Sequence, residues 1–252
     1  MTDIVVHIIN YVIFGTLYNI PCFIPAAIPL LHYNNKSCTI SAMYLLSLPL
    51  PGGETTERQL TLAIWATAEK KLEFKPLPGF NPNLDNLQYY RAQQDIDCDE
   101  VYPGIYIGDG ITAKNKKYLK MLGITHLLNA AEGRRYGFVN TDNNYYADTT
   151  IKYLGLQVTD LPSVDISKYF YIAANFIDEA VSTGGKAFVN CMQGVSRSAT
   201  CVLAYLMIKK NMLATDAIHL VRTNRDIHPN NGFLRQLAEL DNRLRRQRLR
   251  LY

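Results

Sequence analysis

The chain has 252 residues, the length of one large domain or of one ordinary domain with an extension. Hydrophobic residues make up 48% and charged residues 19%, which supports a packed core and excludes disorder throughout. The formal net charge of +4 is too small to indicate nucleic-acid binding. The five cysteines are widely spaced, without a CxxC pair or a Cys/His cluster. They therefore predict neither a disulfide framework nor a zinc site, and they favour a reducing compartment, cytoplasmic or nuclear.

The first part of the chain differs from the rest in charge. Residues 1–50 carry only Asp3 and Lys36 as charged side chains. Residues 4–20 are uncharged and just long enough to cross a bilayer, but polar residues interrupt the run and prolines follow it. Hydropathy leaves residues 4–31 open between a membrane anchor and an additional packed or poorly ordered segment. A wrongly assigned start of the reading frame would look the same.

Residues 51–83 hold a short helical stretch, 57–71, between turns rich in proline and glycine. This composition predicts a linker with little core of its own. We therefore expect an N-terminal extension and linker over 1–83 and a globular domain over 84–252.

The globular part alternates between short apolar runs and segments with helical periodicity. The predicted strands are 104–108, 125–129, 153–158 and 186–190, and the predicted helices are 114–122, 166–181, 198–209, 216–222 and 232–246. Strands separated by helices predict an α/β fold with a central, mostly parallel sheet flanked by helices.

The most informative segment is VNCMQGVSRS, residues 189–198, which joins a predicted buried strand to an apolar helix. Cys191 then lies at the carboxyl end of a strand, where open α/β sheets bind ligands. A tight loop before a helix directs several backbone N–H groups to one point, and Gly194 lets the loop turn. The fork of Arg197 can bind two oxygens of a phosphate.

The same surroundings activate a thiol. Backbone donors and positive charge can lower a cysteine pKa from about 8.5 to about 3.5–7.5, and a thiolate beside an oxyanion cradle is a nucleophile for phosphorus. The alternative is a buried structural cysteine that lies near an arginine by chance. A Walker-type nucleotide loop is excluded, because no GxxxxGK[ST] occurs.

The segment resembles the HCxxGxSRS loop of the cysteine-dependent protein phosphatases, in particular their dual-specificity branch. The resemblance covers about 84–246, including GITHLLNAAEG at 123–133 and PNNGFLRQL at 229–237. It is closest to the small atypical dual-specificity phosphatases related to the vaccinia-virus phosphatase. It implies that 84–252 is the catalytic domain and that no metal or cofactor takes part.

The resemblance assigns further roles. It implies that Asp160 is the general acid, which chemistry also requires for departure of the ester oxygen; the alternative is a turn residue before Leu161 and Pro162. Ser198 either caps the following helix or stabilises the leaving thiolate, and the two roles are compatible. The loop residues expected to bind substrate are Met192, Gln193, Gly194, Val195 and Ser196.

Two positions outside the loop are candidates as well. Arg222 either holds a second phosphate or shapes the pocket rim, or it belongs to a solvated basic helix face. Asn230 is expected to cap the last helix and to support the cradle. The arginine-rich run at 243–250 either binds an acidic partner, nucleic acid or a membrane surface, or is the solvated end of a helix.

One residue departs from the family pattern. Asn190 stands where the family motif has histidine, and an amide replaces the histidine's hydrogen bond to the loop only in part. We therefore predict a slow protein phosphatase acting on phosphotyrosine and phosphoserine/threonine. The alternative is a pseudophosphatase that binds phosphoproteins without hydrolysing them.

The loop also bears on the substrate. Met192, Gln193 and Val195 are neutral, whereas superfamily members that act on inositol lipids or RNA ends tend to place lysines there. We therefore expect phosphoprotein substrates, with MAP kinases as the class that the resemblance suggests, and no nucleic-acid partner.

Overall fold

The computed structural model describes residues 53–67, 77–79 and 96–250, all of which belong to one structural unit. The helices and strands are α3 (Glu57–Ala66), β1 (Cys98–Tyr102), β2 (Ile105–Gly108), α5 (Gly110–Lys114), α6 (Lys116–Leu122), β3 (His126–Asn129), β4 (Lys152–Gly155), α7 (Phe170–Ser182), β5 (Ala187–Asn190), α8 (Arg197–Lys209), α9 (Ala214–Asn224) and α10 (Asn231–Leu249), with 3-10 turns η1 (Asn144–Tyr146) and η2 (Ser167–Tyr169). The expectations for residues 4–31 lie outside the described residues.

The sheet has five strands in the order β1-β2-β5-β3-β4. β2, β5, β3 and β4 run parallel, and β1 pairs antiparallel with β2 at one edge. The predicted α/β fold with a central, mostly parallel sheet is confirmed. The edge strand β1 was not predicted, because CDEVY is short and two of its five side chains, Asp99 and Glu100, are charged.

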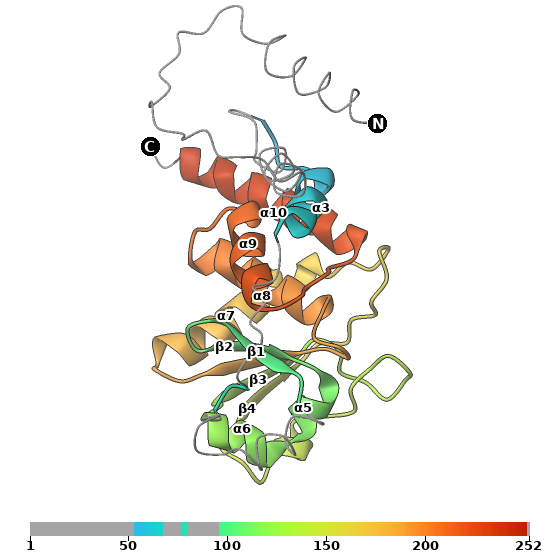
Figure 1. The fold of residues 1–252 in the computed structure, drawn as a ribbon, viewed down its shortest axis with the longest axis vertical. Coiled ribbons are helices and arrows are strands. Elements are labelled where there is room, and N and C mark those ends of the chain that lie inside the picture. The colour runs from blue at the N-terminus through green and yellow to red at the C-terminus, as the bar shows by residue number, and fades with distance from the viewer. Residues whose placement is uncertain (1–52, 68–76, 80–95, 251–252) are drawn as a thin grey trace, which may run out of the picture. The chain divides into compact units, whose positions relative to one another are not determined.

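Both faces of the sheet are buried, and alternate residues of each strand contribute to different cores. In the central strand β5, Ala187 and Val189 join the core under the later helices, while Phe188 joins the core under α6. Figure 1 shows the sheet between these two layers, with α7–α10 on one side and α5 and α6 on the other. This burial on both sides explains the continuous apolar runs in the sequence.

Helix α3 packs on the helices of the globular domain in place of the linker expected over 51–83. Leu60, Ala63 and Ile64 are buried in the larger core, and α3 lies against α9 and α10 (Figure 1). The Thr55 hydroxyl donates to the Asp241 carboxylate at 2.6 Å. The linker interpretation is therefore wrong for residues 53–67, because the apolar side chains of this short helix are buried in the core of the domain.

Arginines of α10 contact the same segment. Arg245 donates to the carbonyl oxygen of Gly53 at 2.9 Å, and Arg246 pairs with Glu54. Part of the arginine-rich run thus holds the chain that leads into α3. Within the described ranges, every helix is too short or too polar to cross a bilayer.

Candidate active site

Cys191 follows the central strand β5, and the loop after it leads into α8. The loop and its neighbours line a pocket of about 490 Å³. The residues lining it are Tyr136, Gly137, Asp160, Cys191, Met192, Gln193, Val195, Ser196, Arg197, His228 and Asn230. The structure therefore brings together the predicted nucleophile, arginine and acid, which lie as far as 37 positions apart in the sequence.

The thiol of Cys191 is buried, at 1% exposure, and is surrounded by donors. Burial opposes ionisation, but hydrogen bonds from the Ser198 hydroxyl and from the backbone N–H groups of Ser198 and Val195 outweigh it, together with the charge of Arg197. The pKa of Cys191 is consequently lowered from its ordinary value. The Ser198 Oγ lies 3.3 Å from the Cys191 Sγ.

The other two cysteines of the described part of the chain provide an internal comparison. Cys98 and Cys201 are also buried, and burial raises the pKa of each thiol to about 12. Burial alone therefore gives an inert thiol in this protein. Only at Cys191, among these three, do local donors reverse the effect.

Gly194 and Arg225 fix the backbone conformation of the loop after Cys191. Gly194 has a φ of +67°, and a Cβ there would lie 2.6 Å from the carbonyl oxygen of Gly108, so a side chain does not fit. Arg225 donates to the Gly194 carbonyl oxygen at 2.8 Å and to that of Gln193 at 3.2 Å. Because these carbonyls are bound from outside, the loop's N–H groups are left to face the pocket.

Arg225 is itself fixed by the strand β1 region. Its guanidinium pairs with Asp97 and Asp99, each at 2.8 Å, and these carboxylates keep its pKa above the ordinary value despite burial. Sequence reasoning missed Arg225. The only available signal was a second arginine three positions after Arg222, and nothing local shows which of the two faces the loop.

Arg197 is buried beside the loop and donates two hydrogen bonds to backbone. Its Nη1 donates to the Val158 carbonyl oxygen and its Nη2 to that of Gly137, both at 3.0 Å. The buried Nε has no hydrogen-bond partner. Since a guanidinium has five N–H donors, these two bonds orient the group and leave donors for an oxyanion.

The Asp160 carboxylate is bound by residues of the loop after Cys191 and by the N-cap residue of α10. Its Oδ1 accepts from the Ser196 hydroxyl and from the Asn230 amide, both at 2.8 Å, and its Oδ2 lies 3.4 Å from the Arg197 Nε. Asp160 and the residues that bind it line the pocket. This is the placement that a general acid needs.

The comparisons with known proteins agree with this geometry. The family model described as dual specificity phosphatase, catalytic domain, matches residues 105–243, which is more than half of the chain. The chain belongs to the dual-specificity phosphatase family. The match includes the whole loop around Cys191 and ends within α10, whereas α3 lies outside it.

Solved phosphatase structures resemble the chain over the same part. The human tyrosine phosphatase-like serine/threonine/tyrosine-interacting protein is 30% identical, with a TM-score of 0.52, over 62% of this chain and 99% of that one. DUSP15 is 32% identical, with a TM-score of 0.51, over 62% and 97%. A mouse putative dual specificity phosphatase complexed with zinc tungstate is 27% identical, with a TM-score of 0.53, over 60% and 91%. The relation to the vaccinia-virus phosphatase stays a prediction.

Two expectations for this phosphatase need correction. Helix α8 begins at Arg197 with Ser196 as its N-cap residue, so Ser198 lies inside the helix and its hydroxyl contacts the thiol instead of capping.

Arg222 is only 9% exposed, and donates to the carbonyl oxygens of Ile64 at 2.8 Å and Ile227 at 3.1 Å. It therefore does not lie on a solvated face, and its donors are used to fasten α3 to Ile227, the residue before His228 of the pocket. The expected role in shaping the pocket rim stays a prediction.

Asn190 does not contact the thiol. Its Nδ2 donates to the Asn129 Oδ1 at 3.2 Å and to the Cys191 carbonyl oxygen at 3.3 Å, whereas its buried Oδ1 has no partner.

The Asn230 Oδ1 caps α10 by accepting from the Phe233 N–H at 3.0 Å. Asn230 thus links the helix start to Asp160.

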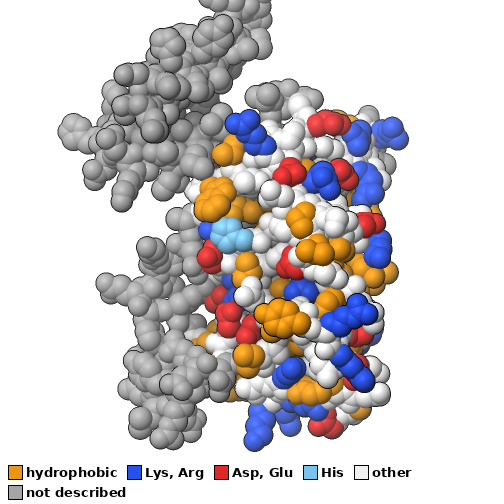
Figure 2. All heavy atoms as spheres, turned by 90° about the vertical axis from the view of Figure 1, so that its right-hand side faces the viewer, with side chains coloured by type: hydrophobic (Ala, Val, Ile, Leu, Met, Phe, Trp, Pro, Cys, Tyr) orange, Lys and Arg blue, Asp and Glu red, His pale blue; other side chains and the backbone are white. Residues whose placement is uncertain are grey.

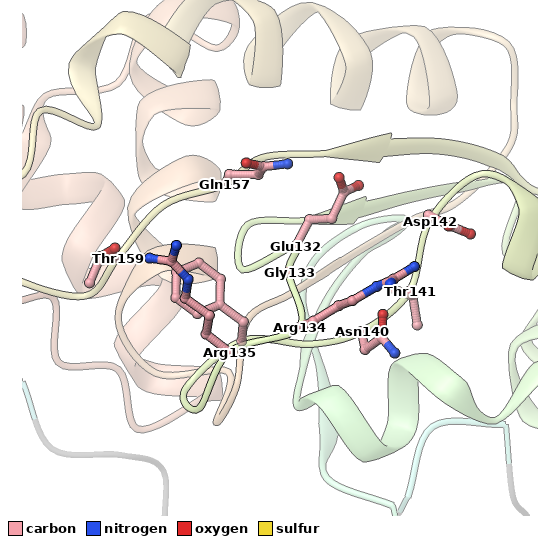
Figure 3. Close-up of a pocket in the computed structure, with 10 residues that line it drawn as sticks. Glu132, Gly133, Arg134, Arg135, Asn140, Thr141, Asp142, Gln157 and Thr159 are labelled. Atoms are coloured by element: carbon pink, nitrogen blue, oxygen red, sulfur yellow. The ribbon is translucent and has the colours of Figure 1, made fainter.

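The phosphatase surface beside this pocket carries both signs of charge. A second hollow, of about 510 Å³, is lined by the 132–142 loop and by Gln157 and Thr159. Figure 3 shows its two arginines diverging, with Arg135 directed toward Thr159 and Arg134 toward Thr141. Glu132 and Asp142 have the opposite charge. Figure 2 shows positive and negative side chains mixed in the same way over the described part of one face.

Proposed function

We propose that this phosphatase hydrolyses phosphotyrosine and phosphoserine/threonine on proteins through a cysteinyl-phosphate intermediate. The observation that carries the proposal is the contrast among buried thiols: the pKa is lowered at Cys191 and raised at Cys98 and Cys201. A buried thiol gains this ionisation only from a site that stabilises negative charge.

In the first step the Cys191 thiolate forms a bond to phosphorus as the bond from phosphorus to the ester oxygen breaks. Loop N–H groups and Arg197 bind the equatorial oxygens, where charge is spread in the transition state. Asp160, protonated for this step, gives its proton to the departing oxygen. The products are a phosphocysteine and the free tyrosine, serine or threonine hydroxyl.

In the second step a water molecule attacks phosphorus and the bond to sulfur breaks. Asp160, now a carboxylate, accepts the proton of the water, and inorganic phosphate forms. The thiolate that leaves is received by the Ser198 hydroxyl, which lies 3.3 Å from the sulfur. A hydrogen bond to a charged acceptor favours this departure.

Phosphoproteins are the substrate class that we propose. The pocket is lined at its mouth by the neutral side chains of Met192, Gln193 and Val195, which offer no cation for a second phosphate of an inositol lipid or an RNA end. MAP kinases are proposed on the resemblance alone.

The alternative proposal is a phosphoprotein-binding pseudophosphatase. Asn190 favours it, because its side chain supplies no hydrogen bond to the thiol and its own Oδ1 is unpaired. The 30% identity to the human tyrosine phosphatase-like serine/threonine/tyrosine-interacting protein also supports this alternative.

Hydrolysis of an aryl phosphate by wild type, Cys191→Ser and Asp160→Ala separates the two. The enzyme hypothesis expects turnover by wild type that vanadate inhibits and chelators leave unchanged, none by Cys191→Ser, and a loss of about 10²–10⁴-fold in Asp160→Ala. Absence of wild-type turnover with intact phosphopeptide binding would establish the pseudophosphatase instead.

A further inference from the structure

We propose that Trp65, on helix α3, is a substrate-contacting residue whose indole binds an apolar or aromatic side chain close in sequence to the phosphorylated residue. This inference deepens the proposed function and rests on its phosphoprotein substrate. It assigns a role to a helix that lies outside the residues matched by the family model.

Trp65 is placed at the catalytic pocket by His228. The two ring centroids are 5.5 Å apart, and His228 is one of the residues lining the pocket of Cys191. The backbone N–H of His228 also donates to the Val195 carbonyl oxygen at 3.0 Å. One side chain therefore separates the indole from the phosphate-binding loop.

The exposure of Trp65 differs from that of the buried apolar residues of its helix. Leu60, Ala63 and Ile64 are buried in the core, whereas Trp65 is 63% exposed. Exposed hydrophobic residues are common and by themselves indicate nothing. Tryptophan next to a pocket is different, because it provides a large, rigid apolar surface and is enriched among the residues that dominate binding energy.

The indole is carried by a fixed element. The carbonyl oxygen of Ile64, the residue before it, accepts from the Arg222 Nε at 2.8 Å. Arg222 also pairs with Asp226, and the Asp226 Oδ1 lies 3.1 Å from the His228 Nε2. These contacts join the end of α3 to the pocket rim, so that little conformational entropy is lost when a ligand contacts Trp65.

The occupant is apolar because the polar groups at this rim already have partners. Asp226 pairs with Arg222, and Asp97 and Asp99 share Arg225, so each of these carboxylates already has a cationic partner in the protein. An aromatic or aliphatic side chain of the substrate would gain contact area with the indole and lose no hydrogen bond.

The test is binding of phosphotyrosine peptides to the full chain carrying Cys191→Ser, followed by fluorescence anisotropy. Three peptides differ only in the residues flanking phosphotyrosine, which are phenylalanine, lysine or glycine. We expect the phenylalanine peptide to bind most tightly, and Trp65→Ala to weaken it about three- to tenfold. The glycine peptide should bind both proteins equally, which also shows that the cradle of the variant is folded.

Two further variants and a spectroscopic signal complete the experiment. Trp65→Phe should keep most of the preference, and Arg58→Ala, an exposed position on the same helix, should keep all of it. Trp65 is the single tryptophan of the chain, so the phenylalanine peptide should change the intrinsic fluorescence and the glycine peptide should not.

Equal affinity of Trp65→Ala and its parent for the phenylalanine peptide would overturn the inference, as would tightest binding of the lysine peptide. Turnover of an aryl phosphate by Arg58→Ala should equal that of wild type, because Arg58 is exposed on α3 and takes no part in the proposed contact. If wild type has no turnover but the peptide preference holds, the enzyme proposal fails while the role of Trp65 stands.

Discussion

The side-chain amide of Asn190 donates to the Asn129 Oδ1 across two neighbouring parallel strands, at 3.2 Å. Both residues are fully buried, and they end β5 and β3 at the edge of the sheet where the catalytic loop begins. The residue before the nucleophile is therefore tied to the sheet, and the donors of the thiol come from Ser198 and Val195. Any influence of Asn190 on the sulfur passes through the Cys191 backbone.

Asn190→His is expected to increase the rate of aryl phosphate hydrolysis. An imidazole has a second ring nitrogen that reaches further than an amide and can donate to the loop, and the unpaired Oδ1 of Asn190 would be removed. The measurement is kcat/KM for a small aryl phosphate at several pH values. A rate that stays the same or falls, in a variant with unchanged thermal stability, contradicts weak activation by Asn190.

Ser198→Ala is expected to slow alkylation of Cys191 at neutral pH. A hydrogen bond to a charged group contributes about 1.5–3 kcal/mol, so its loss should raise the thiol pKa by about one to two units. The sign follows from the native state, in which the pKa of Cys191 is lowered: less thiolate is present at a given pH once the donor is gone. Iodoacetamide labelling of Cys191 against pH, followed by peptide mass spectrometry, measures the shift.

Ser182→Ala is the matched control for that experiment, because Ser182 is an exposed serine on α7. Its labelling curve should coincide with that of wild type. In both proteins Cys98 and Cys201 should label far more slowly, since burial raises the pKa of each to about 12. Coincident curves for Ser198→Ala and wild type would show that backbone donors suffice.

Gly194→Ala is expected to abolish activity, whereas Gly184→Ala should leave it unchanged. Both glycines have a positive φ, +67° and +76°, but a Cβ at 184 meets nothing within 4 Å while one at 194 meets the Gly108 backbone at 2.6 Å. The left-handed backbone costs each variant about 1–2 kcal/mol, and only Gly194→Ala must also displace the loop. Aryl phosphate turnover and urea denaturation measure the two effects separately; activity in a stable Gly194→Ala would contradict the rigidity of the loop.

How much the sequence predicts depends on how local the determinant is. The cradle was predictable because Cys191, Gly194 and Arg197 lie within seven consecutive residues, and a strand–loop–helix pattern defines their geometry. Asn230 was expected to cap the last helix and to support the loop, but its hydrogen bond to Asp160 was not predicted, since the two residues lie 70 positions apart. Long-range polar contacts leave no periodicity in the sequence.

Arg222 and Arg225 illustrate the same limit. Both lie near the end of α9 and both are buried, but one binds the carbonyl oxygen of Ile64 and the other that of Gly194. The contacts of Arg222 depend on α3, and those of Arg225 depend on β1 and the residue before it. Helix α3 was expected within a linker, and β1 was not predicted as a strand. Arg222 alone was expected to hold a second phosphate, to shape the pocket rim or to lie on a solvated face, because helical position does not distinguish the two arginines.

Leu60→Ala should destabilise the catalytic domain, and this tests whether α3 is part of it. Leu60 is fully buried in the core shared with α8, α9 and α10, and removing a buried leucine side chain costs about 2–5 kcal/mol. Leu62→Ala on the same helix is the matched control: Leu62 is only partly buried, so its loss should cost about 1 kcal/mol or less. Urea denaturation followed by circular dichroism should show one transition, displaced to lower urea for Leu60→Ala. Equal midpoints for the two variants would mean that α3 contributes no stability, and the helix would then be a linker after all.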